Sequence, residues 1–183
     1  RPEGVGGPIG QSREDIRAIL SMLDSLLDIA SAESRRGDLA GLAEIDMSAL
    51  VTSLADLYEG SAEDAGLTLE TSIAKGVTML GERMQITRLL SNLLDNAISF
   101  SPPGGEVVVE VAREGDRIVA SVTDQGPGIA PDKRELVFRR FHSDRPEGES
   151  FGQHSGLGLA IARTIAEAHG GTLFVDDPLP GQT

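Results

Sequence analysis

Residues 90–101 read Leu-Ser-Asn-Leu-Leu-Asp-Asn-Ala-Ile-Ser-Phe-Ser, and this stretch decides how the rest of the chain is interpreted. At about 100° per residue, its leucines and Ala97 gather on one broad apolar face of a helix. Asn92, Asn96 and Ser99 form a narrow polar stripe beside that face. Carboxamide oxygens can bind a hard cation while the amide nitrogens donate to phosphate oxygens. Taken alone, the stripe is better explained as the solvated side of an ordinary helix.

The composition narrows the functions that this chain can have. Its 183 residues carry a formal net charge of −13, which disfavours general binding of nucleic acid. The chain contains no cysteine, which excludes disulfides, thiolate zinc sites and cysteine nucleophiles. No apolar run approaches the length of a membrane span. Because the first residue is Arg1 rather than Met, we expect a piece of a longer protein.

The N-terminal residues predict a helix of the dimerisation type. Between residues 12 and 30, apolar residues recur with heptad-like spacing. Two interpretations remain open: half of a helical dimerisation hairpin, or a core helix packed on its own domain. Residues 34–38 read as a linker, which favours the hairpin. We therefore expect a partial dimerisation segment at 1–36 and a second domain at 37–183.

The second domain is predicted to be α+β, a two-layer sandwich with antiparallel strands in one layer and helices in the other. Its first helix should bury Leu50, Leu54 and Leu57 on one side. The expected helices are 48–65, 82–100 and 157–168, and the expected strands are 42–47, 67–73, 77–80, 107–112, 118–123 and 172–175.

A glycine-containing loop follows directly on the predicted strand 118–123. Residues 124–129 read Asp-Gln-Gly-Pro-Gly-Ile. An ionised Asp124 only accepts hydrogen bonds, which suits an exocyclic amino group such as that of adenine. Gly126 and Gly128 let the backbone approach a ligand closely. Alone, the same residues also fit an ordinary turn.

A second glycine-containing segment opens the last predicted helix. Residues 154–159 read His-Ser-Gly-Leu-Gly-Leu, so Gly156 and Gly158 expose backbone N–H groups at the end of a helix that favours phosphate. Ser155 adds a hydroxyl donor. The segment is neither a Walker A motif nor a dinucleotide-binding fingerprint. A simple glycine-rich helix start remains the alternative.

Between these two segments lies a polar stretch typical of a lid or a disordered loop. It begins with Phe-Arg-Arg-Phe-His at 138–142 and stays polar through residue 151. Phe138 and Phe141 are expected to attach it to the core. Arg139 or Arg140 is expected to reach phosphate as a forked donor.

In this order, the motifs resemble the catalytic ATP-binding domain of sensor histidine kinases, in the GHKL ATPase superfamily. The resemblance covers roughly residues 40–176 and implies the Bergerat ATP-binding fold. Residues 96–102, 143–146 and 154–159 also resemble kinases of the ChvG/ExoS type. The segments that correspond to the N, G1, F and G2 boxes of the family are 90–101, 124–129, 138–141 and 155–159.

The resemblance implies that ATP or ADP binds together with Mg²⁺. Asn96 would ligate the metal with Asn92 close by, and Asp124 would accept from the adenine amino group. The backbone amides of 156–158 would contact the phosphates, and Arg140 would approach the γ-phosphate. The nucleotide-binding residues implied in this way are Asn92, Asn96, Ser99, Phe100, Asp124, Gly126, Gly128, Ile129, Arg140, Ser155, Gly156, Leu157, Gly158 and Leu159.

The chain departs from the family pattern in three places. Many relatives carry Lys and Tyr where this chain has Ser99 and Phe100, so we expect one phosphate contact fewer and a modest nucleotide affinity. The chain ends where a last strand would begin, so we expect that strand to be truncated. The only histidines are His142, His154 and His169, each interpreted as structural, so the phospho-acceptor is expected to lie outside this chain.

The expected function is that of the catalytic core of a two-component sensor histidine kinase. It would transfer the γ-phosphate of ATP to a histidine for relay to an aspartate of a response regulator. The whole receptor would be a homodimer, with this domain in the cytoplasm and the receptor in the inner membrane.

Three alternatives remain. One is a nucleotide-independent or degenerate kinase scaffold, suggested by Ser99 in place of Lys. The second is another GHKL ATPase, a hydrolase of the gyrase or Hsp90 type. It is disfavoured because Asn92 stands where those enzymes have a Glu and cannot act as a general base. The third is a serine-directed anti-sigma kinase of the same fold, which the heptad-like helix disfavours.

Overall fold

The computed structural model describes residues 42–140 and 156–176, together with Leu23, Leu27 and Ala30. Those three residues are helical, with exposed side chains. The rest of the predicted N-terminal helix lies outside the described residues, so the dimerisation segment and the domain boundary stay predictions.

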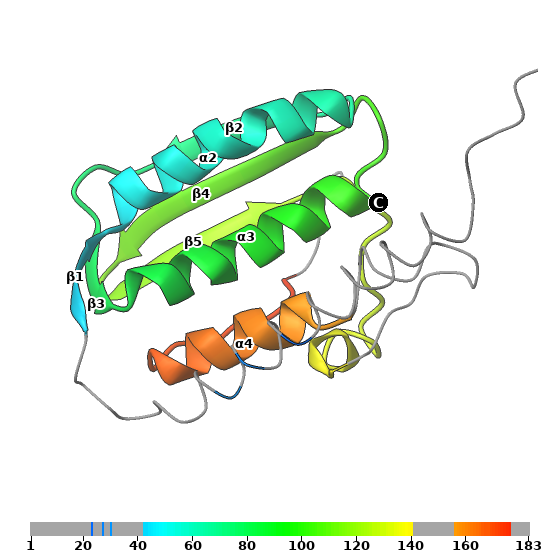
Figure 1. The fold of residues 1–183 in the computed structure, drawn as a ribbon. Helices are drawn as coiled ribbons and strands as arrows, with labels where there is room; N and C mark the ends of the chain where they lie inside the picture. The colour runs from blue at the N-terminus through cyan, green and yellow to red at the C-terminus, as the bar shows by residue number, and fades with distance from the viewer. Residues whose placement is uncertain (1–22, 24–26, 28–29, 31–41, 141–155, 177–183) are drawn as a thin grey trace, which may run out of the picture.

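The described domain is a two-layer α/β sandwich, as expected from the sequence. Figure 1 shows α2 and α3 lying over one face of the main sheet, with α4 beside α3. No helix in the described part of the chain has the length and apolarity that a membrane crossing requires. In chain order the elements are β1 (Ala43–Asp46), α2 (Met47–Asp64), β2 (Thr68–Ile73), β3 (Thr78–Gly81), α3 (Arg83–Phe100), β4 (Glu106–Glu114), β5 (Arg117–Thr123), the 3₁₀ turn η1 (Leu136–Phe138) and α4 (Gly158–Ala168).

The main sheet has the strand order β2-β4-β5, and β1 pairs with β3 in a separate antiparallel ribbon. Strands β4 and β5 form the predicted antiparallel hairpin, with Gly115 in the left-handed region between them. Strands β2 and β4 are parallel, with Leu69 opposite Val107. The prediction of antiparallel strands throughout is therefore wrong at this pair. The reason is that β3 and α3 lie between β2 and β4 in the chain, and such a long crossover brings parallel strands together.

The core lies between the sheet and the helices. Val107, Val109 and Val111 of β4 are buried. Leu90, Leu94 and Ala97 of α3 are buried as well, which confirms the apolar face predicted for that helix. In α2 the prediction for Leu57 is wrong, because its side chain is 73% exposed. The buried face of α2 is centred near Val51, and Leu57 projects roughly a quarter-turn or more away from that centre.

The strand predicted at 172–175 is also not found. These residues have no regular secondary structure, and the side chain of Phe174 is 66% exposed. A strand requires a hydrogen-bonded neighbour, which the alternation of side chains does not provide. Within the described residues, β5 therefore forms one edge of the main sheet with its second side unpaired.

Candidate functional site

One wide, open hollow extends over much of the domain. Three segments distant in the sequence are among those that line it: the second half of α3, the loop after β5 and the first turn of α4. Two predicted residues are not part of the lining. The side chain of Leu157 is fully buried in the core, which leaves its backbone for the predicted contact, and Arg140 is exposed outside the hollow. Ser155 lies outside the described residues. The predicted site residues that the hollow brings together are Asn92, Asn96, Ser99, Phe100, Asp124, Gly126, Gly128, Ile129, Gly156, Gly158 and Leu159.

Asn92 of α3 lies beside Gly158, the first residue of α4. A Cβ atom placed on Gly158 would lie 3.4 Å from Asn92 Oδ1, so the glycine leaves space beside the carboxamide. Within the described residues, the buried Nδ2 of Asn92 has no hydrogen-bond partner. An unsatisfied buried donor costs about 1–3 kcal/mol. A ligand oxygen bound at this point would remove that cost.

The first turn of α4 favours an anion at the same place. No side chain of the described residues caps this helix, and Gly156 before it adopts a φ of +65°. The N–H groups of an uncapped first turn carry the positive end of the helix dipole. Together with the Asn92 amide, they provide a set of neutral donors suited to phosphate.

The loop after β5 holds Asp124 in one orientation. The backbone N–H of Gly126 donates to Asp124 Oδ1 over 2.7 Å. A Cβ atom on Gly126 would lie 2.7 Å from that oxygen and 2.9 Å from the carbonyl oxygen of Phe100, so only glycine fits. This turn leaves the second carboxylate oxygen of Asp124 as an acceptor at the hollow, which is the role expected toward an amino group.

Two further contacts that position the site are not apparent from the sequence motifs. Gln125 Oε1 accepts from the N–H of Glu106 and so ties the loop to the start of β4. No local signal in the sequence distinguishes this glutamine from a solvated one, because its partner is distant in the chain.

His169 is the second such contact, and it joins the end of α4 to the start of α3. Its Nδ1 lies 2.8 Å from the carbonyl oxygen of Ile165, and its Nε2 accepts from the N–H of Glu82 over 3.0 Å. These partners require a neutral ring with the proton on Nδ1. A Cβ on Gly81 would lie 3.1 Å from the ring, so glycine allows this approach. The expected helix end is confirmed, although the ring is partly buried rather than on the surface.

The polar stretch after the loop is attached as expected at its start. Phe138 is 8% exposed and packs in η1, which confirms one of the two predicted aromatic anchors. Phe141, His142 and His154 lie outside the described residues. The predicted mobility of 143–151 therefore stays a prediction.

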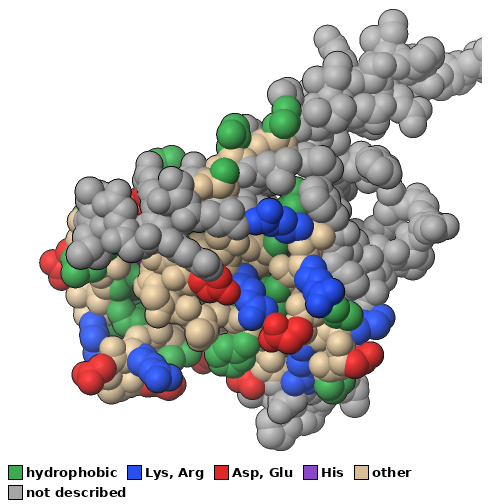
Figure 2. All heavy atoms as spheres, turned by 90° about the horizontal axis from the view of Figure 1, so that it is seen from below, with side chains coloured by type: hydrophobic (Ala, Val, Ile, Leu, Met, Phe, Trp, Pro, Cys, Tyr) green, Lys and Arg blue, Asp and Glu red, His purple; other side chains and the backbone are tan. Residues whose placement is uncertain are grey.

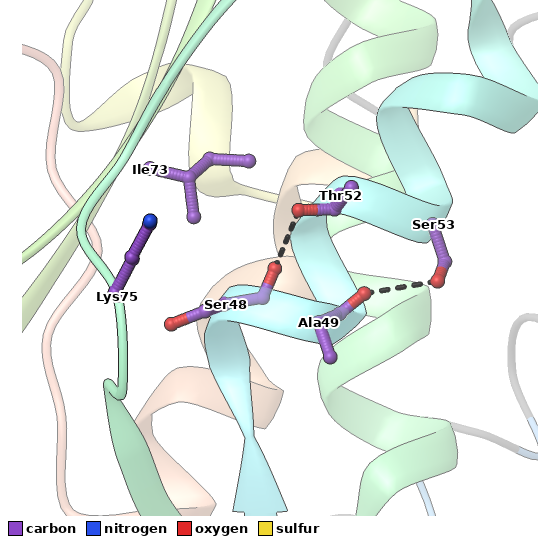
Figure 3. Close-up of a pocket in the computed structure, with 6 residues that line it drawn as sticks. All are labelled: Ser48, Ala49, Thr52, Ser53, Ile73 and Lys75. Carbon is purple, nitrogen blue, oxygen red and sulfur yellow. Dashed lines mark hydrogen bonds between the residues drawn. The ribbon is translucent and has the colours of Figure 1, made fainter.

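A smaller hollow beside the start of α2 has a volume of about 420 Å³ and is formed partly by hydroxyl groups. Its hydroxyls bond to nearby carbonyl oxygens: Thr52 donates to Ser48 and Ser53 donates to Ala49, as Figure 3 shows, while Ser48 Oγ donates to Ala74. These hydroxyl donors are therefore already used, and the site residues predicted from the motifs line the large hollow instead.

Comparison with known proteins agrees with this geometry. Residues 81–183 match the family described as Histidine kinase-, DNA gyrase B-, and HSP90-like ATPase. The chain is 49% identical over 98 residues to the sensor protein ChvG of Rhizobium meliloti (strain 1021), an alignment that covers 53% of this chain and 17% of that protein. The matched part of the chain spans 17% to 36% of the length of the first curated relatives.

Two solved structures are similar in fold and sequence. The mycobacterial sensor histidine kinase MprB has a TM-score of 0.65 and 33% identity, over 77% of this chain and 90% of that one. Full-length ShkA in complex with AMPPNP has a TM-score of 0.76 and 30% identity, over 91% of this chain and 34% of that one. The chain therefore belongs to the histidine kinase-, DNA gyrase B-, and HSP90-like ATPase family, and within it to the sensor histidine kinases.

Proposed function

We propose that the large hollow binds Mg²⁺–ATP and that this chain is the catalytic half of a histidine autokinase. The observation that carries the proposal is the buried, unpartnered amide of Asn92 beside the uncapped first turn of α4. Family membership supports ATP as the nucleotide. The ShkA neighbour was solved with AMPPNP, and we carry that binding mode over to this chain.

The residues around the hollow fit such a ligand. Asp124 accepts from the adenine amino group, and Gly126 allows the base to approach the loop. Asn96, one helical turn beyond Asn92, lines the same hollow and offers a carboxamide oxygen to the metal. The metal would neutralise part of the phosphate charge, and the N–H groups from Gly158 onward would stabilise the rest.

Phosphoryl transfer would then depend on positioning and electrostatics rather than on a protein base. Asn92 cannot deprotonate water, so ATP hydrolysis by this chain should be slow. Of the described histidines, His169 has both ring nitrogens engaged and is not free to attack. We therefore propose that the phosphate acceptor is a histidine of the whole receptor, which then passes the phosphate to an aspartate of a response regulator.

Calorimetric titration with ADP, with and without Mg²⁺, tests the binding site. We expect saturable binding that weakens when the metal is removed. Asp124→Ala should weaken binding by roughly tenfold or more, because a hydrogen bond to a charged group is lost. Lys75→Ala is a matched control, since Lys75 lines only the small hollow beside α2. Wild-type chain that binds neither ADP nor AMPPNP would contradict the proposal and favour the scaffold alternative.

Two activity measurements separate the kinase from its relatives. Steady-state ATP hydrolysis as fast as that of a dedicated ATPase would contradict the role proposed for Asn92. Incubation with γ-labelled ATP should leave no acid-labile phosphate on His142, His154 or His169, and a stable label on any of them would overturn the assignment of the acceptor.

A further inference from the structure

Arg163, in the second turn of α4, holds the segment that leads to Arg140. Its Nη1 lies 2.8 Å from Glu135 Oε2, immediately before η1. Its guanidinium carbon lies 4.9 Å from the centre of the Phe138 ring, at the end of η1. One side chain thus contacts both ends of the stretch 135–138 from the opposite element.

Arginine suits this double contact better than lysine does. A planar guanidinium can stack on an aromatic face while its edge donates to a carboxylate, whereas an ammonium is a single point charge. The hydrogen bond that Arg163 donates to Glu135 raises the pKa of Arg163 above its ordinary value. Arg163 Nε also lies 3.3 Å from Glu167 Oε1, but that pair is internal to α4 and does not reach η1.

The two ends of the segment are held by different parts of the site. At its start, Arg134 Nε donates to the carbonyl oxygen of Ile129 and ties the segment to the loop that carries Asp124. At its end, Arg163 and the buried Phe138 ring tie it to α4. Figure 2 shows the face seen from below, where Lys or Arg and Asp or Glu side chains are interspersed rather than gathered by sign. On such a surface, individual pairs such as Arg163 with Glu135 determine the local electrostatics, rather than a large region of one charge.

Arg163 also stands close to the proposed phosphate site. It follows Gly158 by five residues in the same helix, which corresponds to roughly 7.5 Å along the axis. The N–H of Arg139 bonds back to the carbonyl oxygen of Leu136 and closes η1, so the direction in which Arg140 leaves is set by that turn. Fixing η1 on α4 therefore fixes Arg140 relative to the first turn of the helix.

We propose that Arg163 is a positioning residue that sets where Arg140 meets the terminal phosphate of the nucleotide. This inference rests on the proposed function, because it presupposes a nucleotide at the start of α4. A diphosphate has no terminal phosphate at that position. Loss of Arg163 should therefore weaken binding of a triphosphate and leave binding of ADP nearly unchanged.

Calorimetric titration of the chain with Mg²⁺–ADP and Mg²⁺–AMPPNP tests this inference. For Arg163→Met we expect the Kd for AMPPNP to rise about tenfold, the effect of one lost charged hydrogen bond, and the Kd for ADP to stay within about twofold. Glu135→Gln should act in the same direction with a smaller effect. This variant is safe for folding because the Glu135 side chain is 78% exposed. Arg163→Lys should bind AMPPNP more tightly than Arg163→Met does but more weakly than the wild type.

Glu167→Gln is the matched control. It removes the other carboxylate partner of Arg163 without touching η1, so it should leave both dissociation constants unchanged. If Arg163 acts through Arg140, then Arg163→Met should add nothing in an Arg140→Gln background. Equal weakening of ADP and AMPPNP, equal effects of Glu135→Gln and Glu167→Gln, or additive loss in the double variant would each overturn the inference.

The two proposals fail in different ways. If the wild-type chain binds neither nucleotide, the proposed function itself is wrong. If it binds both and Arg163→Met leaves both constants unchanged, only the role of Arg163 is wrong.

Discussion

The two walls of the proposed nucleotide site hold their polar side chains in place in different ways. Asn92 projects from α3, a helix whose neighbouring residues Leu90 and Leu94 are buried in the core. Asp124 stands on a loop that is held by its own hydrogen bond to Gly126 and by the lack of a side chain there. The helical wall thus takes its geometry from hydrophobic packing, and the loop wall takes its geometry from backbone shape.

This contrast predicts that changes in the helical wall act on the whole fold. Leu94 is 1% exposed, and Leu94→Ala should lower the free energy of unfolding by about 2–5 kcal/mol, the usual effect of a large cavity. Chemical denaturation followed by circular dichroism measures this loss. Under conditions where the variant stays folded, its ADP affinity should match that of the wild type. A loss below about 1 kcal/mol would show that α3 is held less by packing than its burial indicates.

A change in the loop wall should lower the free energy of unfolding less than Leu94→Ala does, and it should weaken ADP binding more. In Gly126→Ala the new methyl group meets two oxygens at 2.7 and 2.9 Å, one of them in the backbone of Phe100. Such overpacking costs about 1–3 kcal/mol, and because the loop must shift, ADP affinity should fall as well. Thermal denaturation and calorimetry of one sample test both parts. Unchanged affinity would mean that this loop does not contact the base.

Gly158→Ala should separate stability from binding. Gly158 is the first residue of α4 and does not adopt a positive φ, and its added Cβ would make only ordinary contact at 3.4 Å from Asn92. Since alanine favours a helix over glycine by up to about 1 kcal/mol, stability should stay level or rise. The methyl group would fill the space beside the carboxamide, so AMPPNP should bind more weakly. Equal affinity in both proteins would move the phosphate site away from Gly158.

The smallest predicted effect concerns Tyr58 of α2, whose partners Ser91 and Asp95 lie on α3, the helical wall. Burial raises the pKa of its hydroxyl above the ordinary 10.0, the Asp95 carboxylate adds to this, and a hydrogen bond with Ser91 opposes it. The neutral hydroxyl thus contributes stability that is complete below about pH 10 and is lost as the pH rises through the native value. Because Tyr58 is the only tyrosine and tryptophan is absent, tyrosinate absorbance reports this group alone. A native midpoint equal to that of the chain in denaturant would refute the shift.

Most of the elements could be predicted because their signals are local. The apolar periodicity of α3 and the alternation of β4 and β5 depend only on the side chains within each segment. The prediction of a strand at 172–175 was wrong because the local side-chain pattern does not show whether a neighbouring strand is present to pair with. The parallel pairing of β2 with β4 was missed for the same reason, since pairing is a property of the whole topology.

The sequence predicted the residues that line the candidate site but not the long-range contacts that hold them in place. Each motif alone fits an ordinary structural role, but their order along the chain resembles one family, and most of the residues identified in this way line one hollow in the fold. The contacts of Gln125, Arg163 and His169 join segments that lie far apart in the sequence, so no motif indicated them. Leu157 has a second role that the motif did not indicate: its side chain is buried in the core, while the contact expected of its backbone amide stays a prediction.

The parallel pairing of β2 with β4 has a consequence for how the domain folds. The β4–β5 hairpin is local and can form early, whereas the pairing of β2 with β4 closes the long loop that contains β3 and α3, so we expect β2 to join the sheet as α3 packs on it. The last pairing of the main sheet therefore coincides with the docking of the helix that carries Asn92. A refolding chain should gain its capacity for nucleotide in the same slow step that completes the sheet, with no earlier species able to hold the ligand.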